Sequence, residues 1–124
     1  MTAGSVSEWT NPLTASDMEQ LNRIELIGIV GSVYVKDFGN TKCANFSVAT
    51  NYCFKDREGC PVIETTWHRV IAWEGGPIRN LERLQKGSHV HVIGRLRMQR
   101  YMCSNGTERT RYEVMPGKVE VITD

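Results

Sequence analysis

The residues that could do chemistry alternate aromatic and basic side chains. Residues 66–73 read TWHRVIAW and place Trp67, Arg69 and Trp73 on one parity. Successive side chains of a strand point to opposite faces, so this segment predicts a strand with one aromatic and basic face. Such a face has two interpretations. It is either an ordinary core with a snorkelling arginine or a surface that contacts a flat, anionic ligand.

A second segment, residues 89–102, has the same composition and places Arg95, Arg97 and Tyr101 on one parity. Unpaired nucleobases stack on aromatic rings, with roughly 1–3 kcal/mol per base, while cations follow the phosphates. A duplex hides its base faces, so the two segments together favour single-stranded nucleic acid. The core interpretation stays open as the alternative. It predicts that mutating Trp67 or Trp73 harms folding and leaves any DNA affinity unchanged.

The charge of the chain is unevenly distributed although its formal sum is only +1. Residues 1–66 carry five Lys/Arg against eight Asp/Glu, a balance of −3. Residues 67–124 carry ten against six, a balance of +4. A local basic surface can bind nucleic acid even where the net charge is small. The half that contains both alternating segments is therefore the candidate for binding.

Patterns typical of enzymes and metal sites do not occur in the sequence. The acidic residues are scattered, and there is no glycine-rich phosphate loop and no Ser/His/Asp set. The four cysteines form no CxxC pair. We therefore expect no catalysis, no metal and no cofactor. Free thiols are the prediction for the cysteines, with Cys53 and Cys60 facing each other across the FKDREG turn as the alternative.

Five β-rich segments must position these residues: 22–38, 42–54, 60–73, 89–102 and 109–123. Gly28 and Gly31 inside the first predict a bulge or sharp bend. Residues 74–87 begin with Gly-Gly-Pro, end at Gly87 and carry apolar Ile78, Leu81 and Leu84, which predicts one short helix. Five strands with a helix between the third and fourth are the order of an all-β OB-fold barrel, although the pattern alone does not fix the topology.

The last hairpin has two possible registers. A two-residue Asn105-Gly106 turn would place Met98 opposite Glu113. A three-residue SNG loop with a left-handed Gly106 would instead pair Leu96 with Val114, Met98 with Tyr112 and Arg97 with Glu113. The second register separates apolar from polar residues, and a slip of one residue would move every side chain to the other face. We therefore expect the three-residue loop.

The ends of the chain and its hydropathy bear on its organisation. Residues 1–20 are polar without sustained periodicity and predict a flexible lead-in to a domain over residues 21–124. No apolar run approaches the ~18 residues of a membrane span, and the first residues lack the features of a signal peptide. We expect a cytoplasmic protein that does not contact membranes.

Four segments resemble bacterial single-stranded DNA-binding proteins. They are NRIELIGIVG (22–31), ANFSVATNYCFKD (44–56), ETTWHRVIAW (64–73) and LQKGSHVHVIGRLR (84–97). The combination of WHRV with KGS and G-LR at this spacing is specific, and the resemblance covers about residues 21–122. It implies sequence-independent binding and protection of single-stranded DNA in replication, recombination and repair. It also implies a homotetramer, with a dimer as the alternative, associated with the nucleoid.

The resemblance also implies site residues. The family's stacking aromatics fall on Phe54, Trp67, Trp73 and Tyr101, where the family commonly has Trp, Trp, Phe and Trp. Its backbone-contacting cations fall on Arg23, Arg69, Arg97, Arg100 and Lys86; for Arg23 and Lys86 a solvated surface charge is an equal alternative. His68 falls near the family's subunit contacts, and His91, with His89 and Ile93, is expected to line a subunit interface.

The sequence departs from the family in three places, the first of which is a lead-in over residues 1–20 that is longer than usual. The family usually continues into a Gly/Pro/Gln-rich linker and an acidic tip that recruits partner enzymes, whereas Asp124 directly follows the last predicted strand. We therefore expect a form without that tail, or one from which it was cut. The segment RTRYE (109–113) adds Arg111 and moves the family's tyrosine. These departures leave two alternatives open: a dimeric barrel like the primosomal replication protein, which binds single strands and partner proteins, and a protein-interaction barrel without nucleic acid.

Overall fold

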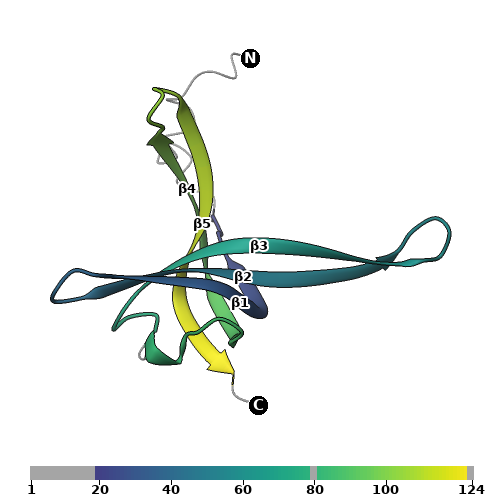
Figure 1. Cartoon of the computed structure of the whole chain (residues 1–124), viewed down its shortest axis with the longest axis horizontal. Helices are drawn as coiled ribbons and strands as arrows, with labels where there is room; N and C mark the ends of the chain where they lie inside the picture. The colour runs from purple at the N-terminus through teal and green to yellow at the C-terminus, as the bar shows by residue number, and fades with distance from the viewer. Residues whose placement is uncertain (1–18, 79–80, 123–124) are drawn as a thin grey trace.

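The computed structural model describes residues 19–78 and 81–122, and its architecture is a closed five-stranded barrel (Figure 1). The strands are β1 (Ile24–Asp37), β2 (Lys42–Lys55), β3 (Pro61–Trp73), β4 (His89–Met102) and β5 (Glu108–Ile122). They close in the order β1-β2-β3-β5-β4, which confirms the predicted all-β OB-fold class. All but the last two residues of the predicted lead-in, 1–20, lie outside the described residues, as do residues 123–124.

The barrel interior is built from alternate residues of every strand. In β2 the predicted parity Ala44, Phe46 and Val48 is fully buried, and in β3 Val70 and Ala72 are fully buried opposite them. Neighbouring residues of the other parity face outward, as the period of two requires. The remaining strands complete the same core with Leu26, Val30, Val90, Val92, Val114 and Val119.

Glycines allow β1 to pair with two neighbours at once. Residues Ile24 to Ile29 pair with β4, while Ile29 to Asp37 pair with β2. A Cβ on Gly28 would lie 2.2 Å from the carbonyl oxygen of Ala49, so only glycine fits between these strands. The β1–β2 register shifts between Val30 and Ser32, at Gly31. The predicted bulge is confirmed.

The short helix predicted within residues 74–87 is present as a 3₁₀ turn. One three-residue 3₁₀ turn, η2 (Leu81–Arg83), is present among the described residues, and residues 79–80 lie outside them. The first part of the segment is a turn, in which the Gly75 N–H donates to the Ile78 carbonyl at 3.0 Å, and the Pro77 carbonyl accepts a hydrogen bond from the Val119 N–H of β5 at 2.8 Å. The predicted apolar residues Ile78, Leu81 and Leu84 are nonetheless all buried in the core. The segment caps the barrel without forming a regular helix.

Two hairpins continue past the barrel as separate arms (Figure 1). The β2–β3 arm (residues 50–65) stays paired as far as Lys55 and Pro61, and the β4–β5 arm (residues 95–114) as far as Met102 and Glu108. They leave the barrel in different directions. In the β4–β5 arm Leu96 pairs with Val114, Arg97 with Glu113 and Met98 with Tyr112, while Gly106 has φ 86°. The predicted three-residue loop and its register are confirmed.

Candidate nucleic-acid interface

Trp67 lies on the outer face of the barrel and is 60% exposed. A Cβ on Gly31 would lie 2.3 Å from Cζ3 of this indole, so the indole covers the β1 bulge. The neighbouring parity of β3 supplies core residues, which confirms the alternation predicted for residues 66–73. Tryptophan is highly buried on average, so an indole held outside the core at this exposure is available to a ligand.

Arg69 and Trp67 line the same cavity, which has a volume of about 350 Å³. Nη1 of Arg69 lies 3.5 Å from Oδ1 of Asn45, a long contact that leaves the guanidinium accessible. Tyr112 of β5 also lines this cavity and is exposed. Sequence reasoning placed Tyr112 correctly opposite Met98 but did not include it in the site. The missing signal was the closure of the barrel, in which β5 pairs with β3.

Trp73 ends β3 at the opposite side of the barrel from the β2–β3 arm and is 43% exposed. Its ring centroid lies 5.5 Å from that of Phe38, with the planes tilted by 30°. Nζ of Lys36 lies 5.3 Å from the Phe38 centroid. Sequence reasoning missed Phe38 and Lys36, which flank the β1–β2 turn. The pair extends the aromatic surface of Trp73 and adds a cation to it.

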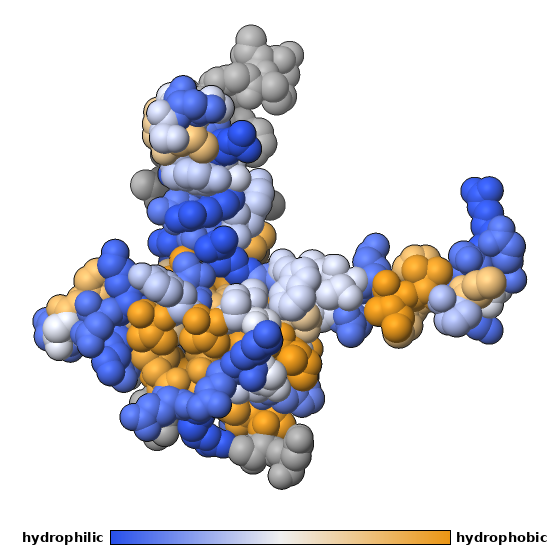
Figure 2. Space-filling model, viewed as in Figure 1, coloured by the Kyte–Doolittle hydropathy of each residue, from blue (hydrophilic) through white to orange (hydrophobic). Residues whose placement is uncertain are grey.

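Phe54 lies on the β2–β3 arm, where it is partly exposed and stacks on Tyr52 with centroids 5.9 Å apart. It pairs with Val62, whereas Trp67 pairs with Ala49, so Phe54 and Trp67 leave opposite faces of the ribbon. Figure 2 shows apolar surface along this arm, where the exposed large hydrophobic residues are Tyr52, Phe54 and Ile63. The four predicted aromatics therefore form several exposed platforms and no single cluster.

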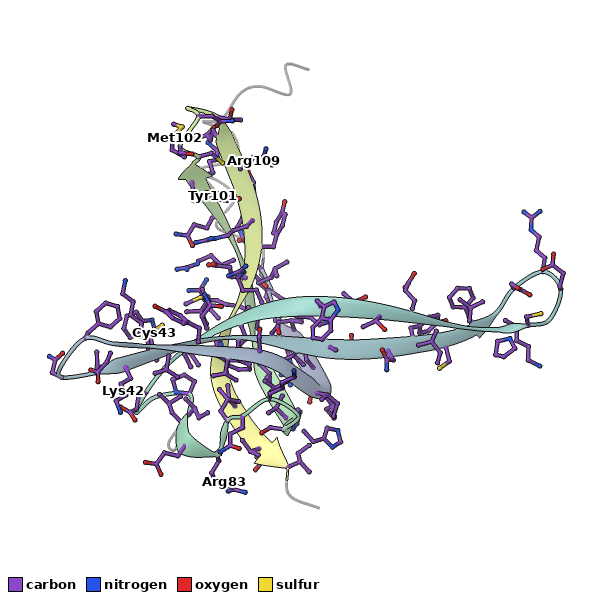
Figure 3. The ribbon with its side chains drawn as sticks, viewed as in Figure 1. Lys42, Cys43, Arg83, Tyr101, Met102 and Arg109 are labelled. Carbon is purple, nitrogen blue, oxygen red and sulfur yellow. The ribbon has the colours of Figure 1, made fainter. Side chains whose placement is uncertain are left out.

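Tyr101 lies near the end of the β4–β5 arm, beside Arg109 on the other strand (Figure 3). The Arg111 guanidinium lies 4.9 Å from the Tyr101 ring centroid. Arg111 in turn contacts Glu113, with Nε 3.1 Å from Oε2, and Arg97 donates from Nη2 to Oε1 of the same carboxylate at 2.8 Å. Glu113 is fully buried. Arg97, predicted as a phosphate contact, is thus engaged by a buried acid.

The other predicted cations are exposed. Arg100 lies on the β4–β5 arm and makes no ion pair to another described residue. Nη2 of Arg23 lies 3.9 Å from Oε1 of Glu25, a solvent-exposed contact of little energetic weight. Lys86 is exposed in the turn before β4. For Arg23 and Lys86 the geometry is compatible both with phosphate contact and with a solvated surface charge.

The two histidines predicted at subunit contacts have different environments. His68 is half-buried where the β2–β3 arm leaves the barrel, and its Nε2 lies 2.9 Å from Oγ1 of Thr50. Burial lowers the pKa of His68 from the usual 6.5, because desolvation disfavours the imidazolium. His91 lies on the outer β1–β4 face with its Nε2 2.6 Å from Oε2 of Glu25.

Other features of the described residues do not belong to this surface. Residues 19–78 and 81–122 contain no group of three His, Cys, Asp or Glu that could hold a metal. Within the same ranges no helix is long and apolar enough to span a membrane. Cys53 pairs with Ile63, so it does not face Cys60 as the alternative for the cysteines required. A cavity of about 770 Å³ between the η2 segment and β5 contains none of the predicted site residues.

Comparison with known proteins gives one consistent result. Residues 21–122 match the model of the single-strand binding protein family. The single-stranded DNA-binding protein of Neisseria meningitidis serogroup A is 32% identical over 105 residues, which are 82% of this chain and 60% of that protein. Single-stranded DNA-binding protein 1 of Xylella fastidiosa is 33% identical over 110 residues, 85% of this chain and 79% of the relative.

A solved structure agrees with these sequence matches. A Plasmodium falciparum SSB in complex with ssDNA superposes with a TM-score of 0.73 at 31% identity, over 86% of this chain and 98% of that one. The chain spans about three-fifths of the length of its Neisseria relative, so the comparison applies to the barrel and its arms. The matched region coincides with the barrel that carries the exposed aromatics and arginines, and the chain belongs to the single-strand binding protein family.

Proposed function

We propose that this protein binds single-stranded DNA with little sequence preference and protects it during replication, recombination and repair. The observation that carries the proposal is the exposed Trp67 indole, which lies over Gly31 and shares a cavity with Arg69. A ring and a guanidinium side by side can accept a base and its phosphate together. The family match and the DNA-bound structural neighbour support the same activity.

The DNA-contacting residues in this proposal are distributed over the barrel and both arms. Bases stack on Phe54, Trp67, Trp73 and Tyr101, and the phosphates are bound by Arg23, Arg69, Arg100 and Lys86, together with Arg109, which is exposed opposite Tyr101. Tyr112 joins this set because it lines the cavity of Trp67, and Phe38 joins it because it packs beside Trp73. Stacking on separated platforms reads no base edges, which accounts for a low sequence preference. Binding of this kind needs no catalytic group and no cofactor.

Assembly is a second element of the proposal. Ile27 and Ile29 are exposed on the outer face of β1, opposite His91 and His89 of β4. Association of copies through this face would bury apolar surface that a monomer leaves in water. We place His91 at this contact and His68 close to a second one. The homotetramer typical of the family is the proposed form, a dimer the alternative, and the nucleoid of the cytoplasm the proposed location.

Tryptophan fluorescence during titration with oligo-dT tests the activity. A Trp9→Phe variant leaves Trp67 and Trp73 as the two reporters. We expect strong quenching that saturates at a fixed number of nucleotides, weakens as salt rises and does not occur with duplex DNA. Variants Trp67→Phe and Trp73→Phe assign the signal to each indole. Absence of quenching and of binding with any single strand would reject the activity and leave the protein-interaction barrel.

A further inference from the structure

One face of the β4–β5 arm carries a continuous chain of contacts that ends at Tyr101. Arg97 and Glu113 pair directly across the two strands, as do Gln99 with Arg111 and Tyr101 with Arg109. Directly paired residues and their second neighbours lie on the same face. The contacts run from Arg97 through Glu113 to Arg111, and from Arg111 to the Tyr101 ring. Arg111 thus connects the buried Glu113 carboxylate to the exposed Tyr101 ring.

The Arg111 side chain is held from two sides. Its Nε lies 3.1 Å from Oε2 of Glu113, an ion pair without hydrogen-bond geometry, and its guanidinium lies 4.9 Å from the Tyr101 centroid. Glu113 is fully buried and must keep a cationic partner, because an unpaired carboxylate away from water is strongly disfavoured. Arg97 supplies the second partner at 2.8 Å. The planar guanidinium suits this position because it can face an aromatic ring while pairing with a carboxylate.

A guanidinium on one face of Tyr101 excludes a nucleobase from that face. The opposite face is the one left for stacking, and the ring is presented in one orientation before DNA arrives. Preorganisation of this kind improves affinity because less ordering remains to be done on binding. The single carboxylate of Glu113 also offsets one of the two positive charges of Arg97 and Arg111, which leaves less positive charge for phosphates than the arginine count of the arm indicates.

We propose that Arg111 is a positioning residue for DNA binding. Arg111 is fixed by buried Glu113 and supports the Tyr101 ring, so that a base stacks on the free face of the ring. Arg97 is the second partner of Glu113 and is not a principal phosphate contact. The inference rests on the proposed single-stranded DNA binding. It assigns a function to an arginine that departs from the family's usual segment.

The test separates positioning from phosphate contact by salt dependence. Each phosphate neutralised on a single strand contributes about −0.7 to the slope of log K against log salt. Oligo-dT affinity is measured between low and high salt for the full chain and for Arg111→Gln, Arg111→Lys and Arg109→Gln. Arg109 is the matched control because it is exposed directly opposite Tyr101 and makes no ion pair to another described residue. Circular dichroism verifies that each variant is folded.

We expect Arg111→Gln to weaken oligo-dT binding about fivefold at every salt concentration, with an unchanged salt slope. We expect Arg111→Lys to weaken binding to the same extent, because lysine keeps the charge but lacks the planar group. Arg109→Gln should reduce the slope. In a Tyr101→Ala background the effect of Arg111→Gln should disappear, since neighbours that act together are not additive.

Three outcomes would overturn the inference. Arg111→Gln could reduce the slope as Arg109→Gln does, it could bind like the wild type, or its effect could persist without Tyr101. If the wild-type chain itself does not bind oligo-dT, the proposed function fails and this inference with it; normal wild-type binding with any of the three outcomes rejects the positioning role alone.

Discussion

The two arms are built alike in backbone and differently in side chains. Both are twisted two-stranded ribbons that leave the same barrel. The β4–β5 arm carries five arginines against two glutamates, a balance of +3, whereas the β2–β3 arm carries Lys55 and Arg57 against three acidic residues, a balance of −1. Figure 2 shows the same contrast, with a mainly hydrophilic β4–β5 arm and an apolar cluster along the other.

The difference extends to how each arm is held. The β4–β5 arm has a polar core of its own, in which Glu113 is fully buried between Arg97 and Arg111. The β2–β3 arm relies on its backbone ladder, on the Tyr52–Phe54 stack and on an exposed hydrogen bond from Thr65 to Asn51. A two-stranded ribbon is marginally stable alone. The β4–β5 arm is therefore the cationic arm, and it has a buried ion-pair network in addition to its backbone ladder.

The largest expected effect in this comparison is on the free energy of unfolding. We expect Glu113→Gln to lower the free energy of unfolding by about 3 kcal/mol, because it leaves two arginines without their buried partner. Their partial exposure keeps the loss at the low end for a broken buried pair. Glu64→Gln, an exposed change opposite Tyr52, should stay within about 0.5 kcal/mol. Urea denaturation of both variants measures the difference. Equal midpoints would show that the Glu113 network does not stabilise the arm.

The second test concerns the barrel between the arms. Gly31→Ala introduces a Cβ that would lie 2.3 Å from the Trp67 ring, so the indole must move. We expect a loss of about 1–2 kcal/mol in oligo-dT affinity, close to that of removing one stacked base. Gly76→Ala is the matched control, because its Cβ would meet nothing within 4 Å. An unchanged affinity for Gly31→Ala would mean that the arms bind DNA without the barrel surface.

The third test compares the charges of the arms. Arg100 is exposed on the β4–β5 arm and Lys55 on the β2–β3 arm. We expect Arg100→Gln to make the salt slope shallower by about 0.7, the value for one phosphate, and Lys55→Gln to change it less. The measurement is oligo-dT affinity over a series of salt concentrations. The reverse order would assign the phosphate path to the β2–β3 arm.

These tests depend on features that the sequence predicted to different extents. The period of two identified all five strands and the core parity of β2 and β3, and it set the β4–β5 register, because one slip would mix apolar with polar residues. The same period could not show that residues 95–114 leave the barrel. Leu96, Met98 and Tyr112 alternate as core residues would, yet all three are exposed. An arm and a barrel wall have the same local pattern and differ in what covers them.

Other parts of the candidate site depend on contacts between distant segments. The packing of Phe38 on Trp73 joins a turn to the end of another strand, and the cavity shared by Trp67 and Tyr112 joins β3 to β5. Neither contact has a signature in local spacing. The hydrogen bond from Val119 of β5 to the Pro77 carbonyl, just before the predicted short helix, likewise joins distant segments. The resemblance to a known family identified the candidate aromatic residues. Their separation on different faces of the molecule could be seen only in the structure.

The smallest expected effect is at His68, where the β2–β3 arm joins the barrel. Its pKa is lowered by burial, so the folded state binds a proton less readily than the unfolded chain. The contribution of neutral His68 to stability is therefore fully present above the usual pKa of 6.5. It is lost as the pH falls from there towards the lowered pKa. His68→Gln should flatten this dependence and leave stability at pH 8 nearly unchanged, as urea denaturation at both pH values would show. If His68 lies at a subunit contact, assembly buries it further, and the loss of wild-type stability at low pH should grow with protein concentration. A loss of stability that does not depend on protein concentration would place His68 outside any interface.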